Sequence, residues 1–273
     1  MTIISMNILF TDKTGTLTEN KMSVKHVSVN LKIFDENNFD ENKFKPLIEV
    51  FSVCNSIDAN TKIGGDATEK SIVSYLEKNN ACLDSVKSSY KIISQNEFNS
   101  RKKIMSTLVE KDDINYLMVK GAIDYILPKC THVLIENMVL ELNEQNKQKI
   151  LENNESLCSK GERVISFAFK KDSQVDQENN LIFVGLIGII DPPRKEVFEA
   201  IKQNKKAGIK TIMITGDHPT TAFAIAKTVG IAKDKSEVLT GKDIDNLSEK
   251  EFSKLTENYS VFARFSPQQV VIF

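Results

Sequence analysis

Four short apolar runs, each stopped by a polar turn, constrain the fold of this chain more than any other feature. They are Ile3–Phe10, Leu181–Ile190, Ile209–Ile214 and Val261–Phe265. Runs of this length are typical of strands covered on both faces in a parallel sheet. Between the later runs, apolar residues recur at helical spacing over Lys195–Ala207 and His218–Val229. This alternation of strands and helices predicts a doubly wound α/β unit.

Residues 21–193 show a different order of expected strands and helices, which predicts an inserted α+β domain. The expected strands are Val24–Val29, Tyr90–Ser94, Lys103–Leu108, Tyr116–Val119 and Val164–Phe169, and the expected helices are Glu69–Lys78 and Asn143–Lys160. Strands grouped with separate helices are typical of α+β domains. The predicted organisation is a first part at 1–20, the insertion at 21–193 and a second part at 194–273. The polar stretch Asp35–Asn42 is expected to be an exposed loop.

Charge and hydropathy exclude several functional classes. The 273 residues include 36 basic and 37 acidic side chains, a balance that disfavours binding to nucleic acid, because phosphate backbones require a basic excess. The longest apolar run, Leu181–Ile190, is about half the ~18–20 residues of a membrane span. The N-terminus lacks the layout of a signal peptide. Four scattered cysteines indicate reduced thiols. We therefore expect a cytoplasmic chain without a membrane span.

The string DKTGTLT at 12–18 carries the clearest chemical signal. Asp12 follows the first apolar run, and open α/β sheets bind ligands beyond the carboxyl ends of their strands. An ionised carboxylate there can bind Mg²⁺ through one oxygen and attack phosphorus with the other. Gly15 lets the backbone approach a phosphate, and the threonines offer hydroxyl groups. A second polar turn, Thr215-Gly216-Asp217, precedes a helix whose N-terminus favours an anion.

These motifs resemble those of the P-type ATPases, in the haloacid-dehalogenase-like superfamily, and most closely those of calcium-pump-like cation transporters. DKTGTLT resembles the phosphorylation motif of the family. The other similar segments are KGA at 120–122, DPPR at 191–194, MITGD at 213–217 and VFAR at 261–264, with looser matches at 65–69 and 98–106. All occur in family order. The resemblance implies an incomplete haloacid-dehalogenase-like Rossmannoid phosphorylation domain with an inserted nucleotide-binding domain, from an ATP-driven cation transporter.

The resemblance also implies a role for each matching residue. Asp12 would be the nucleophile that forms an aspartyl-phosphate from ATP, and Asp12 with Thr14 would hold Mg²⁺. Thr215 would bond a phosphoryl oxygen, beside Gly216, Asp217 and Arg264 at the nucleotide. In the inserted domain, the implied nucleotide-binding residues are Glu69 at the adenine edge, Phe98 stacked on the base, and Lys103, Lys120, Gly121 and Arg163. Arg101 is a weaker candidate, because Ser100 stands where relatives often carry arginine.

Two departures from the family pattern concern catalysis. Val270 occupies the position of a lysine that contacts the phosphoryl group, and the sequence ends at Phe273 before the family's GDGVND segment. We therefore expect ATP binding with weak or absent catalysis, no transport by this chain, and self-association through an unpaired sheet edge. Three explanations are open: a piece or shortened reading frame of a transporter, a stand-alone nucleotide-binding module, or a soluble haloacid-dehalogenase-like phosphatase.

Overall fold

The chain forms two compact units in the computed structural model, which describes residues 7–57, 64–99, 101–172, 178–217, 219–241 and 255–265. Unit 1 comprises Met1–Lys21, Cys158–Gly161 and Asp191–Phe273, and unit 2 comprises Met22–Leu157 and Glu162–Ile190. The chain therefore starts unit 1, builds most of unit 2 as an insertion, and then returns to complete unit 1.

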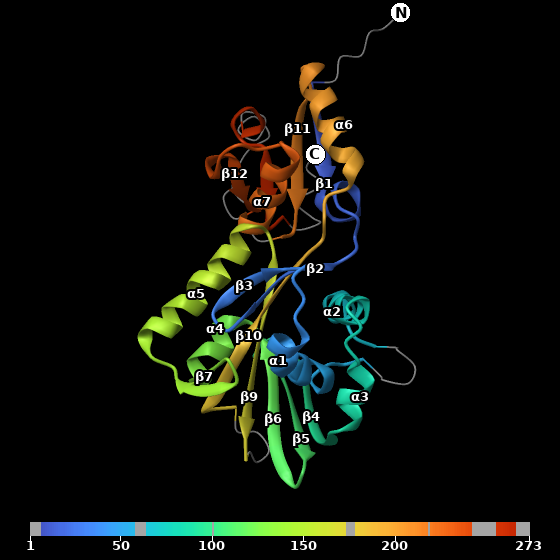
Figure 1. Ribbon diagram of the computed structural model, residues 1–273. Helices are drawn as coiled ribbons and strands as arrows, with labels where there is room; N and C mark the ends of the chain where they lie inside the picture. Colours follow the sequence, from blue (N-terminus) through green and yellow to red (C-terminus); the bar gives the residue numbers. More distant parts are fainter. Residues whose placement is uncertain are drawn as a thin grey trace, which may run out of the picture. The chain divides into compact units, whose positions relative to one another are not determined.

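Unit 1 is built on a parallel sheet that has four strands within the described residues. Their spatial order is β1 (Ile8–Asp12), β11 (Lys210–Thr215), β13 (Val261–Ala263) and β12 (Val238–Thr240). Helix α6 (Lys195–Lys206) packs against β11, and α7 (Pro219–Val229) packs against β13 and β12 (Figure 1). The predicted strand and helix alternation is confirmed for these elements, while Ile3–Met6 and His218 lie outside the described residues. The predicted self-association through a sheet edge stays a prediction.

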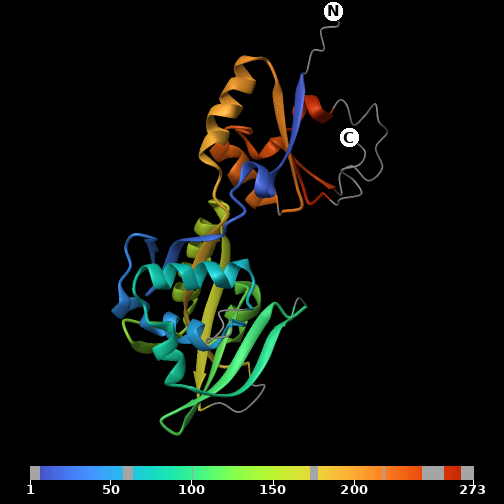
Figure 2. The same cartoon turned by 90° about the vertical axis from the view of Figure 1, so that its right-hand side faces the viewer.

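Unit 2 contains a larger, mostly antiparallel sheet. Its main path runs in the order β3 (Lys32–Asp35), β2 (Ser23–Val29), β10 (Leu181–Ile190), β9 (Arg163–Lys171), β6 (Ile114–Gly121), β5 (Ile104–Lys111) and β4 (Lys91–Asn99). Two further strands, β7 (Cys130–Ile135) and β8 (Met138–Glu141), extend it beside the first half of β10. Figure 2 shows β4, β5 and β6 as long neighbouring strands. The expected strands between 24 and 169 are confirmed, with boundaries shifted by a few residues.

Helices cover both faces of the unit 2 sheet (Figure 1). On one side lie α1 (Glu41–Val53), α2 (Ala67–Lys78) and α3 (Leu83–Ser88), and on the other lie α4 (Ile123–Ile126) and α5 (Glu144–Ser159). Each side has its own buried core. Phe51 of α1 packs edge-on against Phe167 of β9 on the first side, with ring centroids 6.3 Å apart. On the second side, Ile150 and Leu157 of α5 are almost completely buried.

Two sequence expectations about the fold are wrong. The run Leu181–Ile190, which falls within the predicted insertion, forms β10 and lies antiparallel between β2 and β9 rather than in a parallel sheet. Its continuous apolar character still reflects burial on both faces, because helices cover both sides of this antiparallel sheet. The expected loop Asp35–Asn42 is also only partly a loop. Asp40 caps α1 by accepting a hydrogen bond from the Lys43 N–H (3.2 Å), and the helix begins at residue 41.

Candidate functional site

The sheet of unit 1 places two of the predicted catalytic residues at one edge. Asp12 is the last residue of β1 and lies opposite Ile214 in the register with β11. Thr215 is the last residue of β11. Because the two strands are parallel neighbours, Asp12 and Thr215 both stand at the carboxyl end of the sheet. This edge is where open α/β sheets bind their ligands.

The turn after Asp12 leaves an exposed carboxylate beside a buried lysine. The N–H group of Lys13 donates to Oδ1 of Asp12 at 2.7 Å. Gly15 has a φ of 78°, a left-handed conformation that favours glycine, and Thr14 is exposed. Lys13 turns inward, and its Nζ lies 2.6 Å from Oδ2 of Asp217. This ion pair ties the turn after β1 to the turn after β11.

Backbone contacts draw the remaining unit 1 candidates to the same edge. The N–H group of Asp217 donates to Oγ1 of Thr215 (3.2 Å), next to Gly216. The N–H group of Arg264 donates to the carbonyl of Asp217 (3.0 Å), and that of Phe265 donates to the carbonyl of Thr215 (3.1 Å). Six candidates from three distant segments, at 12–14, 215–217 and 264, are therefore neighbours in this unit.

The DPPR segment, residues 191–194, holds the turn after Asp12 in place through side-chain hydrogen bonds. The hydroxyl of Thr18 donates to Oδ2 of Asp191 at 2.6 Å. The guanidinium of Arg194 donates to the carbonyl of Gly15 (3.0 Å) through one terminal nitrogen and to that of Thr18 (3.0 Å) through Nε. No site residue was predicted in this segment, although its resemblance to a hinge segment of the family was a usable signal. Arg194 therefore holds the turn that follows the candidate nucleophile.

Unit 2 contains a cavity of about 550 Å³ that collects all six of its predicted nucleotide-binding residues. They are Glu69, Phe98, Lys103, Lys120, Gly121 and Arg163. Their positions run from 69 to 163, on α2, β4, the turn before β5, β6 and β9, so the fold is needed to assemble them. The other lining residues, which sequence reasoning missed, are Ser56, Asp66, Thr68, Ala122, Val164 and Ile165.

A buried ion pair forms one wall of this cavity. Nζ of Lys120 pairs with Oε1 of Glu69, and both side chains are about nine-tenths buried. The N–H group of Ser56 also donates to this carboxylate (3.2 Å). The ammonium group lies 5.7 Å from the ring centroid of Phe51. These partners stabilise two charges that burial alone would make very costly. The sequence predicted that each residue would face a nucleotide, but it did not predict that they would pair.

The rest of the cavity combines an exposed ring with cationic groups. Phe98, near the end of edge strand β4, is 57% exposed and lines the cavity. Arg163 donates from one terminal nitrogen to Oγ1 of Thr68 (3.1 Å). Gly121 is required by packing, because a Cβ there would lie 2.3 Å from the carbonyl of Lys103. The close approach of these two segments brings Lys103 to the cavity.

The weaker candidate, Arg101, lies away from the cavity, and the two positions that depart from the family pattern lie outside the described residues. Arg101 is in the turn between β4 and β5, where its N–H group donates to Oδ1 of Asn99 (2.8 Å), and it is absent from the described lining of the cavity. Ser100 and Val270 lie outside the described residues. The structure therefore gives Arg101 no contact with the predicted site.

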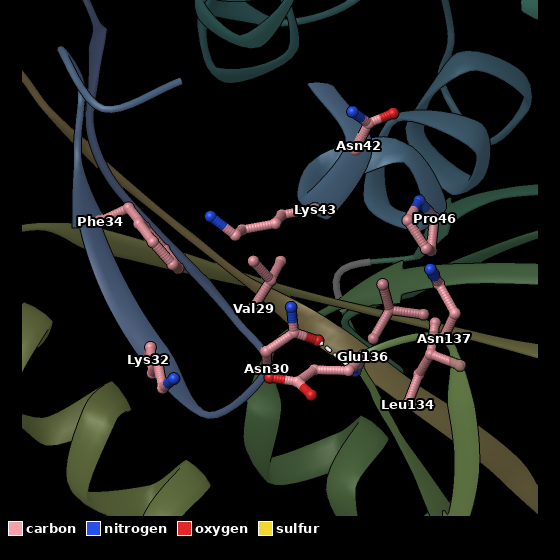
Figure 3. A pocket seen from close by; sticks show the side chains of 11 residues that line it. Val29, Asn30, Lys32, Phe34, Asn42, Lys43, Pro46, Leu134, Glu136 and Asn137 are labelled. Atoms are coloured by element: carbon pink, nitrogen blue, oxygen red, sulfur yellow. Dashed lines mark hydrogen bonds between the residues drawn. The ribbon is translucent and has the colours of Figure 1, made fainter. Parts of the chain in front are cut away.

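A second cavity of unit 2, of about 350 Å³, contains none of the predicted residues (Figure 3). It lies between the turns of the β2–β3 and β7–β8 hairpins and the first turn of α1. Oδ1 of Asn30 accepts a hydrogen bond from the N–H group of Glu136 (2.8 Å), which joins the two turns. β10 pairs with β7 up to Phe183 and with β2 from Gly185, and Val184 between them lines the cavity.

None of the helices described is long and apolar enough to cross a membrane. Among the residues that the structure describes, no group of three or more histidine, cysteine, aspartate or glutamate side chains could hold a metal ion.

Comparison with known proteins gives a consistent set of relatives. A family model described as P-type ATPase, cytoplasmic domain N, matches residues 43–196. Calcium-transporting ATPase 1 of Bacillus cereus is 41% identical over 281 residues, which cover 98% of this chain and 31% of the relative. Calcium-transporting ATPase 1 of Lactococcus lactis is 36% identical, with coverage of 99% and 32%. The sodium/potassium-transporting ATPase subunit alpha-A of Artemia franciscana is 30% identical, with coverage of 99% and 33%.

The chain therefore spans about a third of the length of these curated relatives. The family model alone covers more than half of the 273 residues. The family predicted from the motifs is confirmed, and the protein belongs to the P-type ATPases.

Proposed function

We propose that unit 2 is a nucleotide-binding domain that takes ATP, and that unit 1 is a haloacid-dehalogenase-like phosphorylation domain. The observation that carries the proposal is the cavity of about 550 Å³ in unit 2, which gathers six separately predicted residues. Cavities of this size, with an apolar wall and a few convergent polar groups, are typical of small-molecule sites. A nucleotide supplies the matching chemistry, a flat base joined to a polyanion.

The individual roles follow from the exposure of each side chain. The exposed ring of Phe98 can stack on a base, which is worth about 1–3 kcal/mol. Glu69 and Lys120 form a buried ion pair in the cavity wall, where polar groups are held in place to hydrogen-bond the edge of the base. Lys103 and Arg163 are the cations available to the phosphate groups. Together these side chains match the base and the phosphates of one ligand.

In unit 1 we propose that Asp12 accepts the γ-phosphoryl group of ATP. An oxygen of Asp12 bonds to the γ-phosphorus, the bond from that phosphorus to the bridging oxygen breaks, and ADP leaves. Thr215 bonds a phosphoryl oxygen, beside Gly216, Asp217 and Arg264.

The proposed cation is Mg²⁺, held by the carboxylate of Asp12 and the carbonyl of Thr14. Both residues are exposed and present oxygen donors, which fits a cation that retains several waters. When bound, Mg²⁺ neutralises charge on the phosphate oxygens. The residues of this chain supply the nucleophile and hold the turn around it.

For the whole protein we propose ATP-driven cation transport, with these units facing the cytoplasm. The names of two relatives favour Ca²⁺ as the transported ion. This chain alone is expected to bind ATP and to turn it over poorly, because the apolar Val270 cannot neutralise charge on the phosphoryl group.

The binding proposal is tested by calorimetric titration of the chain with Mg-ATP. Phe98→Ala is expected to weaken binding about 10-fold or more, from the loss of stacking. Phe198→Ala is the matched control, because Phe198 is an exposed phenylalanine on α6 of unit 1 and is expected to leave the affinity unchanged. Equal affinity of the Phe98 variant and the wild type, or no binding by the wild type, would contradict the proposal.

The phosphorylation proposal is tested separately with ATP labelled at the γ-phosphate. A small amount of hydroxylamine-labile label, as expected for an acyl phosphate, should appear on the wild type and disappear in Asp12→Asn. Binding of ATP to unit 2 should be the same in both. Label that survives the substitution would place the phosphoryl group on another residue.

A further inference from the structure

Glu162, the residue before β9, is a buried carboxylate outside the nucleotide cavity. Its side chain is only 2% exposed, and its Oε1 lies 2.6 Å from Nδ1 of His26 on β2. A buried carboxylate is costly unless it is paired and hydrogen-bonded. The N–H group of Glu162 donates to the carbonyl of Leu157 at the end of α5 (3.3 Å). Both the side chain and the backbone of this residue are therefore held in place.

The contact between Glu162 and His26 crosses a third strand at a glycine. β10 lies between β2 and β9, and Gly188 of β10 pairs with His26 on one side and with Val164 on the other. A Cβ at position 188 would lie 1.9 Å from Oε2 of Glu162. A larger residue at position 188 would therefore have to displace the carboxylate from its place over β10. The pair therefore ties the start of β9 to β2 across the sheet.

The next residue, Arg163, faces the opposite side of the sheet. Side chains alternate between the two faces along a strand. Val164 packs in the core on the α5 side, whereas Ile165 packs in the core on the α1 side. Arg163 shares the parity of Ile165 and donates to Oγ1 of Thr68 on α2, at the nucleotide cavity. Glu162 and Arg163 thus hold the same short backbone segment from two faces.

We propose that Glu162 is a positioning residue that, through His26, fixes the backbone from which Arg163 reaches the phosphate groups of the nucleotide. This inference rests on the proposed function of unit 2. Glu162 and His26 are absent from the described lining of the cavity, so they act on the ligand only through Arg163. The pair therefore tunes the affinity for the phosphate groups and leaves the contacts to the base unchanged.

A double-mutant cycle on ATP affinity tests the proposal. Glu162→Ala is expected to weaken ATP binding about three- to tenfold and to leave adenosine binding unchanged. In an Arg163→Ala background the same substitution should have no further effect, because the positioned group is gone. Glu162→Gln keeps a hydrogen-bonding group for His26 and should restore the affinity to within about twofold. If Glu162→Ala does not fold, His26→Gln takes its place in the cycle.

Glu36→Ala is the matched control, since it breaks the ion pair of Lys25 and Glu36 (2.7 Å) beside His26 without touching β9. It should leave ATP affinity unchanged. Additive effects of the substitutions at 162 and 163, or equal losses for ATP and adenosine, would overturn the proposal and leave ATP binding by unit 2 intact. Failure of the wild type to bind ATP would overturn the proposed function, and this inference with it.

Discussion

The charged side chains at the two candidate sites differ in their exposure to solvent. In unit 1, the candidate nucleophile Asp12 is exposed, and the nearby pair of Lys13 and Asp217 is open to solvent on the aspartate side, which is 29% exposed. In unit 2, the pair of Glu69 and Lys120 is buried within the cavity wall. A group that reacts must remain accessible, whereas a group that gives a binding site its shape can be buried. This difference is the one expected from the proposed roles, phosphoryl transfer in unit 1 and nucleotide binding in unit 2.

The sharpest test of this contrast removes one lysine from each pair. Lys120→Met leaves the buried Glu69 without its cation and should lower the free energy of unfolding of unit 2 by about 3–5 kcal/mol. Lys13→Met should cost unit 1 about 1 kcal/mol, because Asp217 is partly solvated. Urea unfolding followed by hydrogen exchange of peptides from each unit measures both values. Equal losses in the two units would remove the contrast.

A second test concerns how unit 1 holds its exposed turn. Arg194→Ala removes the donors to the carbonyls of Gly15 and Thr18 and should destabilise unit 1 by about 2–3 kcal/mol. Arg194→Lys should recover little of this, because an ammonium group lacks the planar fork that reaches both carbonyls. Hydrogen exchange of the peptide containing Asp12 reports the loosening. Full recovery by lysine would mean that charge alone holds the turn.

The smallest effect is expected from pH, and again in unit 1. Burial alone would raise the pKa of Glu237, but hydrogen bonds from the N–H groups of Lys233 and Asp234 and from the hydroxyl of Ser260 lower it below its ordinary value of 4.5. A lowered pKa in the folded state adds stability that is present above the ordinary value and lost as pH falls below it.

Glu237→Gln should therefore cost unit 1 about 1 kcal/mol at pH 7 and flatten its loss of stability below pH 4.5. Unfolding of wild type and variant at pH 7 and at acidic pH measures this dependence. Parallel stability curves for the two proteins would show that Glu237 does not contribute to it.

The sequence predicted best where function and local geometry coincide. The turn after the first apolar run placed Asp12 at a strand end, and the spacing after Thr215 predicted a helix at 218–229, close to α7. The family resemblance also named all six predicted residues in the cavity of unit 2. These signals are short in sequence and do not depend on the rest of the fold.

Features set by contacts between distant residues could not be read from the sequence. The pairing of Glu69 with Lys120 joins positions 51 residues apart, and no local pattern marks it. The apolar run of β10 correctly indicated a strand buried on both faces, but the same pattern fits a parallel or an antiparallel neighbour. Helix α1 was not predicted, because Pro46 and the polar stretch Asp35–Asn42 at its start obscure its apolar periodicity. Its Phe44 and Phe51 are nevertheless buried in the core.

The first and last strands of the insertion have a practical consequence. Ser23, at the start of β2, is the antiparallel partner of Ile190, the last residue of β10. The points where the chain enters and leaves unit 2 are therefore adjacent in a hydrogen-bonded ladder. Such a module can be excised or transplanted with both cut ends meeting at one place, and a short peptide would suffice to join them into a circular permutant.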